Sequence, residues 1–201
     1  MKYRIITVSR QFGSGGRSIA KAVADKLGYA YYDKELVKQV AVETGFSPEY
    51  VEEKGEYAPT RSPLSYAFAM ASTPGLMNGM TAADYLWTIQ RKVILDLADK
   101  GDCVIVGRCA DFILADRPDA LHLFIHADNA YRAQRIVRLY GESEQSPEKR
   151  LADKDGKRSV NYKHFTGREW GNVKNYDLSL NSGKFDEAYC VELIADIVTR
   201  S

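Results

Sequence analysis

The sequence predicts an α/β fold built on a parallel sheet. Short runs of β-branched and aliphatic residues alternate along the chain with longer segments of helical periodicity, which is the order expected of βαβ units. Hydrophobic residues make up 45% of the 201 residues and charged residues 27%, both typical of a globular protein. We therefore expect one domain over residues 1–201 and exclude the disordered, collagen-like and coiled-coil classes.

The first elements are a strand, a glycine-rich turn and a helix. Residues 4–9 (RIITVS) are β-branched and bounded by polar residues, which indicates a buried strand. The helix after the turn ends at Gly28, and its apolar face holds Ile19, Ala20, Val23, Ala24 and Leu27. Residues 30–32 predict a second strand, so the chain opens with a βαβ unit whose strands pair in parallel.

The rest of the chain repeats this alternation after an irregular segment. Further strands are predicted at residues 103–107, 121–125 and 176–180, and helices at 35–42, 81–100, 130–140 and 186–199. Between residues 34 and 80 the pattern weakens, which indicates an insertion of helices and loops beside the sheet. Residues 148–170 are strongly polar with few large apolar anchors, and they predict a mobile flap.

Charge, cysteine spacing and the distribution of apolar residues limit the partners and the compartment expected for this protein. The 28 basic and 27 acidic residues leave a formal net charge of +1, which argues against a nucleic-acid coat protein. Cys103, Cys109 and Cys190 have no zinc-like spacing. The start lacks the apolar core of a secretory signal, and no stretch approaches the ~20 apolar residues of a membrane span. We expect a reduced cytoplasmic protein with neither nucleic acid nor membrane as partner.

The strongest chemical signal is the turn RQFGSGGRS at residues 10–18. Glycines allow backbone N–H groups to converge on an anion, and the following helix N-terminus adds a positive dipole. A phosphate loop reads Gly, four residues, Gly, Lys, then Ser or Thr, and aligning Ser18 with the hydroxyl puts Arg17 in the lysine position and Gln11 in the first glycine position. We predict that Ser18 binds Mg²⁺ and that the donor phosphates are held by Gly13, Ser14, Gly15, Gly16, Arg17 and Ser18. The alternative is an ordinary turn with a solvated Arg17.

Five segments carry a resemblance to a known family: residues 9–17 (SRQFGSGGR), 31–35 (YYDKE), 104–108 (VIVGR), 162–168 (YKHFTGR) and 176–181 (YDLSLN). Together they resemble the cytidylate-kinase-like group of phosphate-loop nucleoside monophosphate kinases. The resemblance extends from the first predicted strand to the last, and residues 45–80 carry no matching motif.

This resemblance implies a three-layer P-loop NTPase fold with a five-stranded parallel sheet in the order 2-3-1-4-5. It also implies a monophosphate-binding insertion at about residues 34–85 and an arginine-bearing lid at about residues 148–170. The implied activity is that of a kinase transferring a phosphoryl group from ATP, with Mg²⁺, to a cytidylate-like nucleoside monophosphate.

The expected catalytic residues are cations, because the transition state of phosphoryl transfer spreads negative charge over several oxygens. The candidates are Arg17 in the loop and Arg150, Lys154 and Arg158 in the predicted lid. The resemblance implies that Arg132, in the helix after the fourth strand, approaches ATP. A solvated helix face is the alternative for each of these side chains outside the loop.

The acceptor is expected at the carboxyl ends of the strands, where open α/β sheets bind ligands. The resemblance implies that Arg108 contacts the acceptor phosphate and that Asp155 keeps the lid's acid-then-arginine spacing with Arg158. Asp33 ends a strand on this side, and it either holds magnesium through water, orients the acceptor or caps the next helix.

Two other functions remain open. Cys109 stands where the family has an aspartate, which leaves room for a kinase of a non-nucleotide metabolite such as a sugar or a cofactor precursor. Arg17 in place of lysine leaves room for a nucleotide-binding regulatory module without turnover. The sequence does not predict the oligomeric state.

Overall fold

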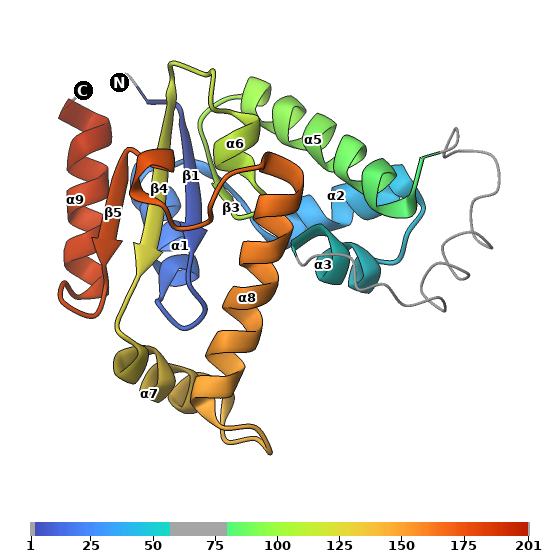
Figure 1. Cartoon of the computed structure of the whole chain (residues 1–201). Helices are drawn as coiled ribbons and strands as arrows, with labels where there is room; N and C mark the ends of the chain where they lie inside the picture. Colours follow the sequence, from blue (N-terminus) through green and yellow to red (C-terminus); the bar gives the residue numbers. More distant parts are fainter. Residues whose placement is uncertain (1–2, 57–79, 201) are drawn as a thin grey trace.

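The computed structural model describes residues 3–56 and 80–200 (Figure 1). Within this part, five parallel strands form one sheet in the order β2-β3-β1-β4-β5, which confirms the order implied by the resemblance. The strands are β1 (Ile5–Arg10), β2 (Ala30–Tyr32), β3 (Cys103–Val106), β4 (Ala120–His126) and β5 (Leu178–Asn181). The helices are α1 (Gly16–Leu27), α2 (Lys34–Thr44), α3 (Pro48–Glu56), α5 (Ala82–Lys100), α6 (Ala110–Ile113), α7 (Asn129–Tyr140), α8 (Pro147–Thr166), the 3₁₀ turn η1 (Val173–Asn175) and α9 (Glu187–Arg200).

The central strands are buried on both faces, so successive side chains point alternately into two separate hydrophobic cores. Ile5 and Ile105 point to the side covered by α2, α3, α5 and α6. Ile6 and Val104 point to the opposite side, where α1 and α9 pack. Helices on both faces of the sheet give the three-layer architecture expected of the fold (Figure 1).

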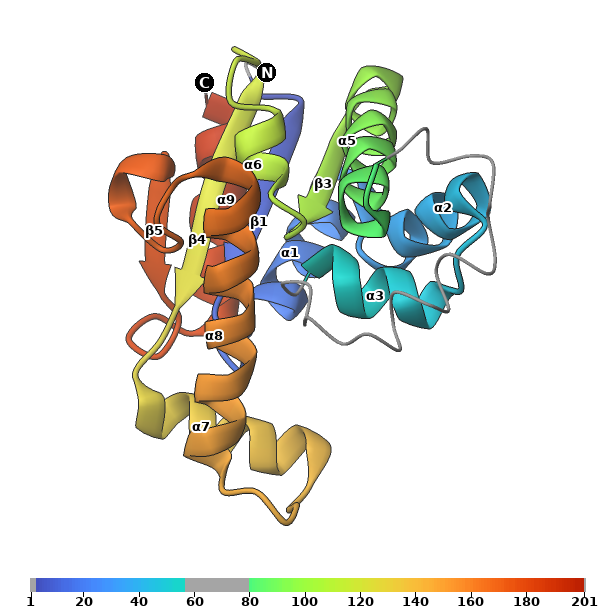
Figure 2. The same cartoon turned by 45° about the vertical axis from the view of Figure 1, so that its right-hand side comes forward.

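Helices α7 and α8 extend the molecule beyond the carboxyl ends of the strands. α7 leaves the end of β4, and α8 runs back from there toward α6 (Figures 1 and 2). Since α1 also begins at this end, a glycine-rich turn, two helices and the strand ends converge on one region. This is where open parallel sheets bind their ligands.

The structure departs from the sequence-based expectation most clearly at the predicted flap. Residues 147–166 form one continuous helix, α8, which starts with the N-cap Ser146, whose Oγ accepts a hydrogen bond from Lys149 N–H, and ends at Gly167. Its buried residues are Leu151, Arg158, Asn161 and Tyr162. The predicted insertion at residues 34–85 contains α2, α3 and the start of α5, and its central part, 57–79, lies outside the described residues.

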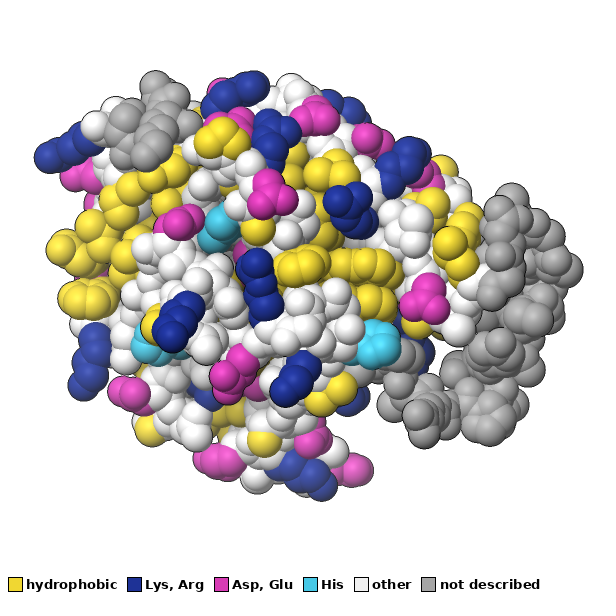
Figure 3. Space-filling view, turned by 45° about the horizontal axis from the view of Figure 1, so that its top comes forward, with side chains coloured by type: hydrophobic (Ala, Val, Ile, Leu, Met, Phe, Trp, Pro, Cys, Tyr) yellow, Lys and Arg dark blue, Asp and Glu magenta, His cyan; other side chains and the backbone are white. Residues whose placement is uncertain are grey.

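Basic and acidic side chains are interspersed on the face shown in Figure 3, in keeping with the near-neutral formal charge. Among the helices of residues 3–56 and 80–200, none is long and apolar enough to cross a membrane.

Candidate functional site

The glycine-rich loop connects β1 to α1 at the carboxyl edge of the sheet. Gly13 and Gly15 have φ angles of 80° and 83°, a left-handed conformation that side chains disfavour. The loop is braced internally, because Ser14 Oγ donates to the Gln11 carbonyl oxygen at 2.9 Å. Backbone N–H groups of this bend and the N-terminus of α1 make a concave, positively polarised surface suited to phosphate.

A cavity of about 290 Å³ opens over this loop. Its walls come from the loop, the first turn of α1, α7 and α8. The cations that line it are Arg10, Arg17, Arg135, Lys154 and Arg158, against a single lining acid, Glu52, among the described residues. Such a lining favours a polyanion, and we call this space the donor cavity.

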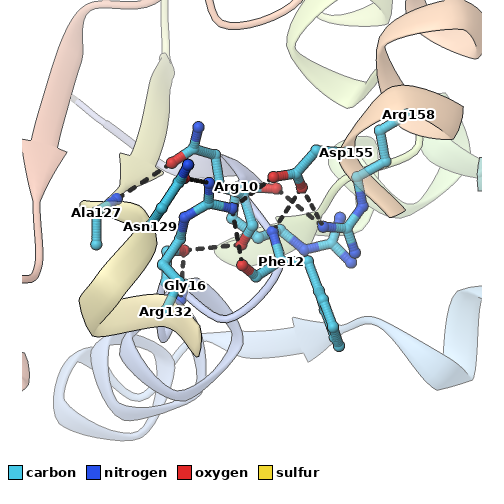
Figure 4. A network of polar contacts seen from close by, with 10 residues as sticks. Arg10, Phe12, Gly16, Ala127, Asn129, Arg132, Asp155 and Arg158 are labelled. Atoms are coloured by element: carbon cyan, nitrogen blue, oxygen red, sulfur yellow. Dashed lines mark hydrogen bonds and ion pairs between the residues drawn. The ribbon is translucent and has the colours of Figure 1, made fainter. Parts of the chain in front are cut away.

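Asp155 ties α8 to the loop (Figure 4). Its carboxylate accepts from Phe12 N–H at 2.7 Å and from Arg132 Nη1, and Arg158 Nη1 lies 3.6 Å away. Arg132 also donates to the Phe12 carbonyl oxygen at 3.1 Å. Arg132 is 5% exposed, so its guanidinium binds loop and lid helix rather than lining the donor cavity.

Arg17 and Ser18, predicted to bind phosphate and magnesium, both line the donor cavity and both already contact another side chain. Arg17 forms a two-point ion pair with Asp33, at 2.9 Å and 3.1 Å. Ser18 Oγ accepts from Arg135 Nη2 at 3.0 Å, and Arg135 in turn pairs with Glu187 of α9 at 2.7 Å. Asp33 occupies the N-cap position of α2, but its carboxylate makes no capping hydrogen bond.

The oxygen ligands of this region suit a magnesium ion that is bound mainly by a nucleotide. Among the described residues there is no cluster of three or more His, Cys, Asp or Glu side chains that would hold a metal. Mg²⁺ on a nucleotide keeps water and phosphate oxygens as its main ligands and needs only one or two protein oxygens. The Ser18 hydroxyl and the Asp33 carboxylate are oxygens of that kind.

Arg108 lies in a strained turn after β3. Gly107, Arg108 and Cys109 have φ angles of 71°, 61° and 55°, and two of them carry side chains. Left-handed non-glycine residues are costly and concentrate at binding sites. The Arg108 guanidinium is buried and donates to the Val51 carbonyl oxygen of α3 at 2.7 Å, which links the strand end to the insertion.

A second, small hollow of about 20 Å³ lies beside this turn. It is lined by Ser9, Arg10, Gly107, Arg108, Cys109, Arg158, Asn161, Tyr162 and Trp170. Arg10 and Arg158 line both this hollow and the donor cavity. We call it the acceptor hollow, because the family resemblance implies that Arg108, which lines it, contacts the acceptor phosphate.

The floor of the acceptor hollow is a buried polar network. The Tyr162 hydroxyl donates to Asp111 at 2.6 Å and the Ser9 hydroxyl donates to its other oxygen at 3.3 Å. Burial raises the pKa of the Asp111 carboxyl, while these hydrogen bonds oppose that rise. Asn161 is 3% exposed and its Oδ1 has no hydrogen-bond partner among the described residues.

The remaining predicted lid residues lie further out. Lys154 lines the donor cavity and also an open outer cavity of about 630 Å³, which Arg150 lines as well. Arg150 Nη1 donates to the Gly141 carbonyl oxygen at 2.9 Å. The structure therefore brings Arg17, Lys154 and Arg158 to one cavity and leaves Arg150 at its outer side.

Sequence reasoning did not select several residues that line these spaces. Arg10 lies within the glycine-rich motif but was given no role of its own, and neither Arg135 nor Asn161 was selected. Glu187, which pairs with Arg135, comes from the last helix. A search for arginines at the end of a predicted strand would have found Arg10, since that position faces the ligand edge in a parallel sheet.

Comparisons with known proteins identify the family of this chain. The sequence profile of the cytidylate kinase-like family matches residues 5–184. A cytidylate kinase from Archaeoglobus fulgidus is 29% identical over 197 residues, covering 96% of this chain and 93% of the relative.

Solved structures match over almost the whole chain. The crystal structure of an uncharacterized protein from Eubacterium ventriosum has a TM-score of 0.72 at 25% identity, covering 98% of this chain and 99% of the other. The shikimate kinase from Acinetobacter baumannii in complex with shikimate has a TM-score of 0.55 at 14% identity, covering 98% and 94%, a likeness of fold alone. The profile match over most of its length shows that this chain belongs to the cytidylate kinase-like family.

Proposed function

We propose that this protein transfers the γ-phosphoryl group of ATP to a nucleoside monophosphate, with cytidylate as the first acceptor to test. The observation that carries the proposal is the pair of arginines, Arg10 and Arg158, that line both the donor cavity and the acceptor hollow. A phosphoryl group passing between two anionic substrates needs cationic groups at that junction.

In the proposed reaction the bond from the γ-phosphorus to the β,γ-bridging oxygen breaks, and a bond to an oxygen of the acceptor phosphate forms. ADP leaves, and the acceptor becomes a diphosphate. The acceptor phosphate is already anionic, so no protein side chain has to remove a proton from it. The protein's contribution is to align the two anions and neutralise the charge spread over the transferring group.

The donor side is assigned to the loop and the lining cations. The donor phosphates are assigned to the loop backbone of Gly13, Gly15 and Gly16, with Arg135 and Lys154 at the cavity wall. Ser14 N–H donates to the Gln11 carbonyl oxygen at 3.3 Å and Gly16 N–H to Ser14 Oγ at 3.4 Å, so these two groups would exchange partners on phosphate binding. Mg²⁺, held by the phosphates and by Ser18 or Asp33, would screen the phosphate charges when bound. Phe12 and Tyr140 both line this cavity, with ring centroids 5.9 Å apart, and offer an aromatic surface for the adenine.

The acceptor side is assigned to Arg108 and the hollow beside it. The hollow's volume of about 20 Å³ has room for one or two water molecules, so it would have to widen, with movement of Arg108, to admit the acceptor phosphate. The Arg108 guanidinium would exchange its α3 carbonyl partners for the phosphate of the acceptor. Asn161 Oδ1 is buried and would accept a hydrogen bond from an N–H or O–H group of that substrate. Asp155 keeps Arg158 oriented at 3.6 Å, which makes it a positioning residue in this proposal.

The test is ADP formation from Mg-ATP across a panel of nucleoside monophosphates, shikimate and simple sugars, with a no-acceptor control. The proposal predicts ADP formation that depends on one monophosphate. Turnover with shikimate or a sugar alone would favour a kinase of a non-nucleotide metabolite. ATP binding without ADP formation for any compound would favour a regulatory module and contradict the proposal.

Arg158→Ala tests the arginine at the junction. It is expected to lower kcat by about 100-fold or more while the Kd for ATP stays within about tenfold, because the group acts mainly in the transition state. Arg138→Ala, on the exposed face of α7, is the matched arginine control. Normal turnover by Arg158→Ala would remove Arg158 from the mechanism.

A further inference from the structure

Gly16 and Arg10 meet at the base of the donor cavity. A Cβ atom added to Gly16 would lie 2.5 Å from the Arg10 Cβ, 3.0 Å from its Cγ and 3.3 Å from the Ile125 Cβ. Real Cβ atoms do not approach other carbons to 2.5 Å. The Arg10 side chain therefore takes the space that any side chain at position 16 would need.

The backbone gives no other reason for a glycine at position 16. The left-handed glycines of the loop are Gly13 and Gly15, whereas Gly16 is the first residue of α1 and does not have a positive φ. A glycine with helical dihedrals costs helix stability relative to alanine. The close contact with Arg10 is thus what requires glycine here.

Arg10 is well placed to meet the donor phosphates. It is the last residue of β1, it is 5% exposed, and it lines both the donor cavity and the acceptor hollow. Its carbonyl oxygen accepts from Arg158 Nη1 at 3.2 Å, which fixes the backbone at the strand end (Figure 4). The strand and this hydrogen bond constrain the Arg10 backbone, and burial constrains its side chain more than exposure to solvent would.

Arg17 is placed differently. Its guanidinium is held by the Asp33 carboxylate in the two-point ion pair, and its side chain is 43% exposed. The Arg17 guanidinium would have to exchange this carboxylate for phosphate, and the 43% exposure of its side chain leaves its charge more screened by solvent than that of the buried Arg10. Arg17 also lines the donor cavity, so Arg10 and Arg17 are the two candidates for the cation that binds the donor phosphates.

The phosphate-loop pattern can be aligned one residue earlier. With Gly15 as its second glycine, position 16 is the lysine position and position 10 is the first-glycine position. In this alignment Arg10 takes the first-glycine position and Gly16 the lysine position. Arg17 then takes the hydroxyl position, which Ser18 occupies only in the alignment that begins at Gln11. The steric contact between Arg10 and Gly16 explains why the changes at these two positions occur together.

We propose that Arg10 supplies, from the end of β1, the phosphate-binding cation that a phosphate loop ordinarily carries on the first turn of its helix, and that Gly16 provides the space for it. The inference deepens the proposed function and rests on it, because it assumes that this loop holds the phosphates of ATP.

The direct test compares Arg10→Met with Arg17→Met, each replacing a cation by a neutral side chain of similar length. Binding of inorganic tripolyphosphate is measured by calorimetry, and turnover with ATP where an acceptor has been found. Arg10→Met is expected to lose about 100-fold in kcat/KM for ATP, and at least tenfold more than Arg17→Met loses. An equal or larger loss in Arg17→Met would overturn the inference.

Exchanging the residues at positions 10 and 16 distinguishes phosphate binding by Arg10 from a merely structural role. Gly16→Lys alone is expected to be inactive and less heat-stable, because its Cβ meets Arg10. The double variant R10G/G16K removes that contact and returns the cation to the helix, so it should bind tripolyphosphate at least tenfold more tightly than Arg10→Gly. A structural role predicts no such rescue, and its absence in a double variant with native-like circular dichroism would overturn the inference.

Measurements on the wild-type chain distinguish a failure of the proposed function from a failure of the role proposed for Arg10. Tripolyphosphate binding without turnover for any acceptor would contradict the proposed function, and the Arg10 and Arg17 comparison would still be decided by binding. A wild-type chain that binds neither tripolyphosphate nor ATP would overturn both. Arg138→Met serves as the control for loss of an arginine outside the cavity.

Discussion

Arg132 illustrates how a buried arginine can belong to the scaffold of a site. Its guanidinium contacts the Phe12 carbonyl oxygen, the Asp155 carboxylate and the Asn129 side chain, so three segments meet at one cation. With only 5% of the residue exposed, solvent cannot replace these partners. Removing one member of a buried pair is strongly destabilising because the other charge is left uncompensated.

We therefore expect Arg132→Ala to lower the free energy of unfolding by about 3 kcal/mol. Urea denaturation followed by circular dichroism measures this change. Arg138→Ala on the exposed face of the same helix should change stability by less than about 0.5 kcal/mol. Equal effects of the two substitutions would mean that the Arg132 contacts add nothing to stability.

Gly55 allows Arg108 to pack against α3. A Cβ at Gly55 would lie 2.1 Å from Arg108 Nη1 and 2.7 Å from Gln90 Oε1, so Gly55→Ala must displace the guanidinium. Overpacking of this kind costs about 1–3 kcal/mol. If Arg108 binds the acceptor phosphate, the KM for the acceptor should also rise by about tenfold, a change of about 1.4 kcal/mol, with little change in the KM for ATP.

Gly156 is the matched control, because it also lies inside a helix and a Cβ there would meet nothing within 4 Å. Gly156→Ala is expected to raise the free energy of unfolding by about 0.5–1 kcal/mol, since alanine restricts the unfolded chain and favours helix. A Gly55→Ala variant that is stabilised to the same degree would show that the Arg108 packing is not restrictive.

The roles of single residues were the least predictable level. The glycine loop was visible in the sequence because its spacing is local. The contacts of Arg17 with Asp33, of Arg10 with Gly16 and of Arg135 with Glu187 join residues that only the fold brings together. No local pattern distinguishes an arginine that faces phosphate from one that faces a carboxylate.

At the scale of elements, β1 and β4 are joined by a buried polar pair. Thr7 Oγ1 lies 2.8 Å from His122 Nδ1, and burial lowers the pKa of His122 from its usual value. Nearby Asp177 and Asp111 oppose that shift without cancelling it. Burial lowers the pKa of His126, at the end of the same strand, as well.

This arrangement predicts acid sensitivity. As pH falls below about 6.5 the unfolded chain binds protons at these histidines before the folded chain does, so stability falls, by at most about 1.4 kcal/mol per pH unit for each histidine. Denaturant midpoints at several pH values between 5 and 8 measure the slope. His122→Gln should reduce the slope of stability against pH, and His126 should account for part of the slope that remains. An unchanged slope would contradict a buried, neutral His122.

Helix α8 shows why its segment resembled a flap in the sequence. Its inward face is largely polar, since Arg158, Asn161 and Tyr162 are buried through hydrogen bonds and cavity walls rather than through an apolar stripe. Hydrophobic periodicity is therefore weak, and the helix signal that remained was Ser146 followed by Pro147. The central strands β1, β3 and β4, by contrast, were predicted well because they are buried on both faces and mostly apolar.

At the scale of the whole molecule, the α/β class followed from alternation of strands and helices, and the strand order only from the family resemblance. Alternation does not order strands, because order depends on which side of β1 each crossover passes. The insertion was predicted from its broken pattern, and α2 and α3 lie within its predicted bounds. Which acceptor the hollow admits depends on shapes that no sequence period encodes.

Nucleotide binding should stabilise the whole fold, because α1, α7 and α8 all line the donor cavity. A ligand at 100 times its Kd raises the free energy of unfolding by about 2.7 kcal/mol. We expect ATP to shift the thermal midpoint upward and ATP with the true acceptor to shift it further. An acceptor that supports turnover but adds no further stabilisation would argue against adjoining sites.

In the proposed reaction the phosphoryl group crosses from the donor cavity to the acceptor hollow, past Arg10 and Arg158. The most direct measurement follows label from [γ-³²P]ATP in the presence of cytidylate and each other nucleoside monophosphate. The account predicts label in the β-phosphate of one nucleoside diphosphate, formed in equal amount to ADP. Label appearing only as inorganic phosphate, at a rate independent of every acceptor, would contradict it.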